Sequence, residues 1–158
     1  MISISSARDN KKDLTFLDIA FRLGTLSTCS RASVGAVIVR EGRCISWGFN
    51  GAPPGLPHCS ETNHGLEVPR GDKLEISLQP RGAGCQWATH AEANALAYAA
   101  RQGISTDGGT LYVSISPCAT CSRLLIAAGI VRVCYNDLYR DTTGLDLLHD
   151  AGVDVVRP

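Results

Sequence analysis

Residues 110–121 read TLYVSISPCATC and contain a junction between two kinds of structure. The run Thr110–Ile115 is expected to form a buried strand. Pro117 suits the first turn of a helix, which we expect over Cys118–Ala128. A second strand is expected over Ile130–Tyr135. The segment therefore predicts the strand–helix–strand unit that is typical of α/β proteins.

Strands and helices alternate along the rest of the chain as well. Apolar residues at helical spacing predict a first helix over residues 12–27. A turn at Glu41–Arg43 joins two β-rich runs and predicts a hairpin. The other expected elements are strands over 34–39, 44–49 and 153–156 and helices over 91–100 and 143–150. This order predicts an α/β fold in which a mixed five-stranded sheet carries helices on both faces.

Residues 52–88 interrupt this alternation with a long insertion that is rich in proline and glycine. We expect it to be irregular, and loops of this length are usually functional or held by a metal. There is no repeat and no low-complexity tract. A length of 158 residues is typical of one domain, so residues 1–158 are assigned to a single domain that carries this insertion.

Charge and composition favour a small substrate over long nucleic acid. The 15 Lys and Arg residues balance the 15 Asp and Glu residues, whereas proteins that bind long nucleic acid usually carry a basic excess. No segment resembles a signal peptide or a membrane span, so we expect a cytoplasmic protein without a membrane partner. Thiols stay reduced in that compartment, and seven cysteines there suggest metal binding more than disulfides.

Two short motifs place metal ligands at the start of two helices. Cys118 and Cys121 form Cys-x-x-Cys at a helix N-terminus, where the helix dipole stabilises thiolates. His90, from the preceding helix, supplies a third ligand and leaves a fourth position open for water, as in catalytic zinc sites. Glu92 follows two residues later and is expected to carry protons between that water and the substrate.

Each motif alone is open to another interpretation. Cys-x-x-Cys also occurs as a redox pair, and His-x-Glu by itself carries little information. In this order, however, His-x-Glu and Pro-Cys-x-x-Cys form the established signature of zinc-dependent nucleobase deaminases. A non-catalytic zinc module that senses nucleotides is the alternative from a different class, and the carboxylate at Glu92 argues against it.

Beyond these motifs, the chain resembles the deoxycytidylate deaminase family over roughly residues 14–155. The segments that carry the resemblance are residues 27–37, 48–59, 90–95, 116–121, 139–141 and 150–153. Phe49 stands where the family usually has Tyr. The resemblance implies a three-layer α/β/α cytidine-deaminase-like fold and the hydrolysis of dCMP to dUMP and ammonia, which supplies dUMP for thymidylate synthesis.

The resemblance also implies regulation and assembly. Family members are commonly homohexamers that dCTP activates and dTTP inhibits, with Mg²⁺ accompanying the nucleotide. The region of Phe49, Asn50 and Gly51 resembles the part of the family that contacts the regulatory nucleotide or the substrate sugar.

Several residues are expected to bind the substrate, each with a competing structural role. Asn50 can donate to and accept from a sugar hydroxyl, or it can simply form a turn before Gly51. Arg31 suits the 5′-phosphate but is also compatible with a solvated surface position. Arg140 is the rival phosphate ligand. The neighbouring Tyr139 either covers the nucleotide or has only a packing role in the fold. Ala91 and Ser116, next to the metal ligands, complete the expected substrate contacts.

Four further residues around the insertion suggest a second, structural zinc. They are Cys29, Cys59, His64 and Cys85. Some bacterial and phage members of the resembled family carry a structural zinc at similar places, and a closed four-ligand site would keep the insertion ordered. His58 is the rival for the fourth position, and free thiols with a surface histidine are the alternative. The two remaining cysteines, Cys44 and Cys134, are expected to be small buried residues within strands.

Related deaminases remain as alternatives. A tRNA adenosine deaminase shares both motifs but should have a basic surface and a basic C-terminal helix, whereas this chain ends in GVDVVRP. A deaminase of free cytidine normally has Cys at the position of His90. A 5-substituted dCMP is harder to separate from dCMP, because the choice depends on the shape of the pocket.

Overall fold

The computed structural model describes residues 7–29, 31–59, 61, 68–70, 73–75 and 87–158. Its elements are α1 (Ala7–Gly24), β1 (Gly35–Arg40), β2 (Arg43–Phe49), β3 (Val68–Arg70), β4 (Lys73–Glu75), α2 (Ala91–Arg101), β5 (Thr110–Ile115), α3 (Ala119–Ala127), β6 (Arg132–Asp137), α4 (Thr143–Asp150) and β7 (Asp154–Val156). All nine expected elements are present. The antiparallel pair β3–β4 lies within the insertion and was not expected.

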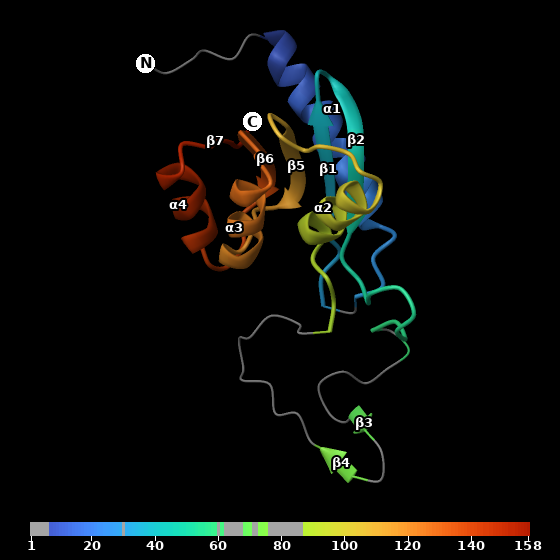
Figure 1. Ribbon diagram of the computed structural model, residues 1–158. Helices are drawn as coiled ribbons and strands as arrows, with labels where there is room; N and C mark the ends of the chain where they lie inside the picture. The colour runs from blue at the N-terminus through green and yellow to red at the C-terminus, as the bar shows by residue number, and fades with distance from the viewer. Residues whose placement is uncertain (1–6, 30, 60, 62–67, 71–72, 76–86) are drawn as a thin grey trace.

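The central sheet has five strands in the order β2-β1-β5-β6-β7. β1 is antiparallel to both β2 and β5, whereas β5, β6 and β7 run parallel to one another. α1 packs against β1 and β5 on one face, and α2, α3 and α4 occupy the other (Figure 1). The predicted mixed five-stranded sheet between two helical layers is therefore confirmed.

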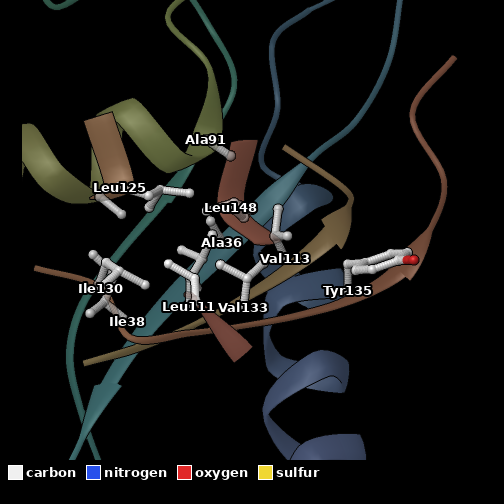
Figure 2. Packing of buried hydrophobic residues seen from close by; sticks show 12 residues of the cluster. Ala36, Ile38, Ala91, Leu111, Val113, Leu125, Ile130, Val133, Tyr135 and Leu148 are labelled. Atoms are coloured by element: carbon white, nitrogen blue, oxygen red, sulfur yellow. The ribbon is translucent and has the colours of Figure 1, made fainter. Parts of the chain in front are cut away.

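Residues of each central strand alternate between two apolar clusters, because successive side chains point to opposite faces of a sheet. The cluster on the side of α2, α3 and α4 contains Ala36, Ile38, Leu111, Val113 and Val133 from the strands. Figure 2 shows Ala91, Leu125 and Leu148 from these helices beside the same strand residues. The cluster under α1 contains the intervening residues, Val37, Val39, Tyr112 and Cys134. Both faces of the sheet are thus buried.

α1 buries a narrower stripe than its apolar spacing predicted. Leu17 and Ala20 are buried against the sheet, but Leu14 and Phe21 remain 49% and 57% exposed. A carboxylate takes one of the inward positions, since Asp13 is 3% exposed and bonded to Arg132. The helix also begins at Ala7 instead of residue 12 and ends at Gly24 instead of residue 27.

The two strand cysteines differ in burial. Cys134, in the interior strand β6, is fully buried as expected. Cys44 is exposed, so the expectation of a buried residue was wrong there. Its strand, β2, lies at the edge of the sheet near the β1–β2 turn, where Glu41 and Gly42 have positive φ. Among the residues described, no helix is both long and apolar enough to cross a lipid bilayer.

Candidate active site

The three expected metal ligands meet where two helices begin. His90 is the N-cap of α2 and Cys118 is the N-cap of α3, and both have extended backbone angles without a side-chain capping bond. Their side chains are therefore not used to cap their own helices. Cys121 lies in the first turn of α3, one helical turn beyond Cys118. The three ligand atoms all lie within 4.8 Å of one another.

This arrangement fits zinc. Nδ1 of His90 is 3.5 Å from Sγ of Cys118 and 3.5 Å from Sγ of Cys121. Zinc with Zn–S near 2.3 Å and Zn–N near 2.0 Å in tetrahedral geometry requires N···S edges of about 3.5 Å. Two thiolates and an imidazole are also a preferred donor set for zinc. The residues are thus spaced for one ion, with three protein ligands and one position left.

Hydrogen bonds within the site prepare a thiolate. The Cys121 thiol, His90 and the backbone N–H of Cys121 together lower the pKa of Cys118 well below its usual value, against the opposing effect of burial. The pKa of Cys121 rises in turn, because it bonds to Cys118 and is buried beside Glu92. Metal binding requires both sulfurs as thiolates, so an ion at this site would release the remaining proton.

Glu92 is 4% exposed and lies in the first turn of α2, two residues after His90. Burial raises the pKa of its carboxyl to about 7, while His90 and a bond from Cys121 act in the opposite direction. A carboxyl group with a pKa near neutrality both accepts and returns a proton at physiological pH, as a general acid–base group must.

Close backbone contacts hold the two helix starts in place. Thr89 and Gly51 exchange backbone hydrogen bonds of 2.8 and 3.1 Å, which fasten the residue before His90 to the end of β2. A Cβ atom on Gly48 would lie 2.5 Å from the Ala91 carbonyl oxygen, so β2 and α2 touch through their backbones. Indole Nε1 of Trp87 donates to the Pro57 carbonyl at 3.1 Å and links the two ends of the insertion.

A cavity of about 350 Å³ opens beside the metal ligands. Its wall includes all six residues expected to bind substrate: Arg31, Asn50, Ala91, Ser116, Tyr139 and Arg140. Phe49 and Gly51 are not among its lining residues. Instead, the Phe49 ring stacks on Trp47 with centroids 6.3 Å apart.

Sequence reasoning missed the apolar part of this wall. The additional lining residues are Cys29, Ala32, Val34, Ala88, Ile115 and Leu138. Val34 and Ile115 were assigned only to strands, and no motif marked Leu138. These residues could have been predicted from the sequence, because they lie close in the chain to the expected substrate contacts Arg31, Ser116 and Tyr139.

Two polar side chains in the wall are bonded to the backbone around them. The Ser116 hydroxyl accepts a hydrogen bond of 2.8 Å from the Tyr139 backbone N–H. The Asn50 amide bonds to the backbone of both Ala32 and Val34. The side chain of Arg140 lies over the Tyr139 ring, 5.5 Å from its centroid.

The expected second zinc site is only partly described. Cys29 is half-buried and lines the cavity, and Cys59 is buried at the start of the insertion. His64 and Cys85 lie outside the described residues. His58 is exposed. Within the described part of the chain, His90, Cys118 and Cys121 are the one group of three that could hold a metal.

Comparison with known proteins agrees with this geometry. The family model for the cytidine and deoxycytidylate deaminase zinc-binding region matches residues 10–137. The deoxycytidylate deaminase of Enterobacteria phage T4 is 34% identical over 91% of this chain and 88% of its own length. That of Mycobacterium phage D29 is 43% identical, over 78% of this chain and 92% of its own.

A solved structure gives the same result. The dCMP deaminase from the cyanophage S-TIM5, crystallised with dCMP and dUMP, is 30% identical and has a TM-score of 0.75. The match covers 94% of this chain and 97% of that one. The family model spans His90, Cys118 and Cys121, and both phage relatives extend over most of the chain. The chain therefore belongs to the cytidine and deoxycytidylate deaminase family.

Proposed function

We propose that this chain is a zinc-dependent deaminase that hydrolyses dCMP to dUMP and ammonia, and so supplies dUMP for thymidylate synthesis. The observation that carries the proposal is that one cavity contains both a zinc-binding group with a buried carboxyl group and arginines that can bind a phosphate. Its wall includes the buried carboxyl group of Glu92, two of the three zinc ligands and two arginines, Arg31 and Arg140. The names of the T4, D29 and S-TIM5 relatives support dCMP as the substrate.

The reaction needs water to be activated and protons to be moved. Zinc held by His90, Cys118 and Cys121 supplies the Lewis acidity that makes water a nucleophile at neutral pH. The Glu92 carboxylate takes a proton from that water and delivers it to N3 of the pyrimidine as oxygen adds to C4. It then carries the second proton to the departing amino group, which leaves as ammonia. Burial keeps other water away from the carboxylate.

The remaining wall residues account for the rest of the nucleotide. Arg31 and Arg140 suit the 5′-phosphate because guanidinium groups match phosphate oxygens. Asn50 lines the same cavity, and Tyr139 covers the nucleotide. Ala91 and Ser116, which flank the metal ligands in the chain, border the pyrimidine.

A second, structural zinc bound by Cys29, Cys59, His64 and Cys85 is also part of this proposal. The burial of Cys59 within a proline-rich segment supports it. We further propose a cytoplasmic location, because the ligand thiols Cys118 and Cys121 must stay reduced to bind metal.

Regulation by dCTP and dTTP with Mg²⁺, in a homohexamer, completes the proposal. The stacked rings of Trp47 and Phe49 offer a flat apolar surface for a nucleotide base near Asn50 and Gly51. Large apolar side chains on the surface, including Leu14, Phe21 and Trp47, support contacts between subunits.

Substrate profiling tests the proposed function. Purified protein is incubated with dCMP, CMP, deoxycytidine and 5-methyl-dCMP, and ammonia release is followed with and without dCTP and Mg²⁺. Turnover of dCMP far above CMP and deoxycytidine is expected. Preference for 5-methyl-dCMP would replace the substrate with a 5-substituted nucleotide. No turnover of any of the four by zinc-loaded protein would overturn the proposal and lead to tests of tRNA or of a nucleotide-sensing role.

A further inference from the structure

Asn50 follows the last residue of β2 and is 7% exposed. Its Oδ1 accepts a hydrogen bond of 2.8 Å from the Val34 backbone N–H, and its Nδ2 donates to the Ala32 carbonyl at 2.8 Å. Its own backbone N–H donates to the Val34 carbonyl at 3.1 Å. Three hydrogen bonds therefore join Asn50 to one short stretch of backbone that is 16 to 18 residues away in sequence.

Ser27, at the other end of that segment, is also hydrogen-bonded to Asn50. Its hydroxyl donates to the Asn50 carbonyl at 2.8 Å and accepts from the Cys29 backbone N–H at 3.2 Å. The described residues between 27 and 34 contain no helix or strand, so these bonds take the place of regular structure there. Ser27 itself does not line the cavity.

The segment held in this way forms one wall of the cavity. It contributes Cys29, Arg31, Ala32 and Val34 to the lining. An amide has two N–H donors and two acceptor lone pairs, and Asn50 uses one of each on the Ala32–Val34 backbone. Half of its hydrogen-bonding capacity is thus committed to the wall that carries Arg31.

We propose that Asn50 is a positioning residue, which sets the affinity for the nucleotide by holding the Arg31 segment against the cavity. This inference rests on the proposed dCMP deaminase function. The proposed role differs from direct binding of the sugar, because Asn50 changes the affinity for the nucleotide through the position of Arg31. Loss of the amide removes the acceptor of the half-buried Val34 N–H and the shorter of two hydrogen bonds to the Ala32 carbonyl, which keeps only a bond of 3.4 Å from the Ser27 hydroxyl. The segment is then held less firmly against the cavity.

The test is a pair of double-mutant cycles on the full-length, zinc-loaded enzyme with dCMP. We expect Asn50→Ala to raise KM by about tenfold or more while kcat changes by less than about threefold. In an Arg31→Ala background, the same substitution should change KM by less than about twofold, because the arginine that it displaces is absent.

The second cycle uses the substrate in place of a second mutation. With 2′,3′-dideoxy-CMP, which lacks the 3′-hydroxyl, Asn50→Ala should raise KM by the same factor as with dCMP. A direct hydrogen bond to that hydroxyl would instead give a much smaller effect with the dideoxy substrate. Additive effects with Arg31→Ala, or an effect that disappears with the dideoxy substrate, would overturn the positioning role.

Ser27→Ala keeps the Asn50 amide and carries the test if Asn50→Ala does not retain zinc. It should raise KM by about threefold, again only when Arg31 is present. Thr25→Ala is the matched control, since it loses a hydroxyl-to-carbonyl bond of 2.7 Å from the same stretch of chain without loosening residues 27–34. An unchanged KM in Ser27→Ala would contradict the inference. An inactive wild-type enzyme would instead overturn the proposed function itself.

Discussion

Glu92 combines near-complete burial with a position beside thiol and imidazole ligands. An acidic side chain is rarely buried unless it is paired or functional, because removing its charge from water is costly. Among the described residues, no other carboxylate lines the cavity. At the scale of single residues, the proposed site therefore consists of one buried carboxyl group and three candidate metal ligands.

Replacing that carboxyl group should abolish turnover and leave the metal site intact. We expect Glu92→Gln to lower kcat by about 10²–10⁴-fold, since an amide of the same shape cannot carry the proton. Zinc content, measured by atomic absorption, should stay at the wild-type level. Glu41→Gln, in the exposed β1–β2 turn, should keep full activity. Retained activity in Glu92→Gln would remove Glu92 from the mechanism.

The cysteines provide a second test at this scale. Cys118→Ser should lose one zinc equivalent per chain relative to wild type and all deaminase activity, because a serine hydroxyl is a poor zinc ligand. Cys44→Ser changes an exposed cysteine outside the cavity and should keep both. Equal zinc content in the two variants, measured on protein dialysed against a weak chelator, would contradict the assignment of the ligands.

At the scale of elements, local signals predicted some boundaries better than others. β5 and α4 begin and end where the sequence indicated, because Gly108 and Gly109 precede the strand and Ala151 and Gly152 follow the helix. β6 begins at Arg132 instead of Ile130, since its pairing with β5 sets the register, and pairing is a long-range contact. The β3–β4 pair carried no periodicity that distinguished it from the surrounding loop.

The contact between β2 and α2 is the element-scale feature on which the site depends. A Cβ atom at Gly48 would lie 2.6 Å from the Ala95 backbone N and 2.9 Å from the Asn94 Cβ, so Gly48→Ala must push α2 outward. We expect a loss of about 1–3 kcal/mol of unfolding free energy. The folded enzyme should also lose about tenfold or more in kcat, because α2 carries Glu92 and has His90 as its N-cap.

Gly109→Ala is the control for that prediction. Its Cβ atom would lie 2.8 Å from the Thr106 carbonyl oxygen, at the end of β5 away from the cavity. Urea unfolding should show a comparable loss of stability, whereas kcat of the zinc-loaded protein should stay within about twofold of wild type. Equal kcat in the two glycine variants would show that the position of α2 does not limit catalysis.

At the scale of the whole molecule, one ionic network joins the beginning of the chain to its end. Asp13 of α1 accepts hydrogen bonds of 2.8 and 2.7 Å from Arg132 of β6 and one of 2.9 Å from the Tyr112 hydroxyl of β5. Arg132 also bonds to Asp154 of β7 at 2.9 Å. The network therefore fixes α1 on its face of the sheet.

The sequence could predict the chemistry of the site but not these long-range connections. His90, Glu92, Cys118 and Cys121 are recognisable because two short motifs hold them at fixed spacings. Asp13 gave no such signal, since a carboxylate in an amphipathic helix normally faces solvent. The bonds of Asn50 to Ala32 and Val34 also depend on the path of an irregular segment, which no periodicity describes.

Breaking this network should destabilise the whole fold in a way that depends on pH. Burial by itself would raise the pKa of Asp13, but the bonds from Arg132 and Tyr112 outweigh it and hold the pKa below its usual value. A carboxyl group with a lowered folded-state pKa stabilises the protein above its unfolded pKa, near 4, and this contribution is lost as the pH falls through the folded value. Asp13→Asn should therefore cost about 2–3 kcal/mol at pH 7, because it leaves Arg132 without its buried partner.

Urea unfolding at pH 7 and at pH 3 measures this difference. The gap between wild type and Asp13→Asn should narrow at pH 3, where the wild-type carboxylate begins to take up a proton. Asp154→Asn removes the other partner of Arg132. The Asp154 side chain is 63% exposed, so this substitution should cost less than about 1 kcal/mol at either pH. A gap of equal size at both pH values would mean that Asp13 contributes through packing and neutral hydrogen bonds and not through its charge.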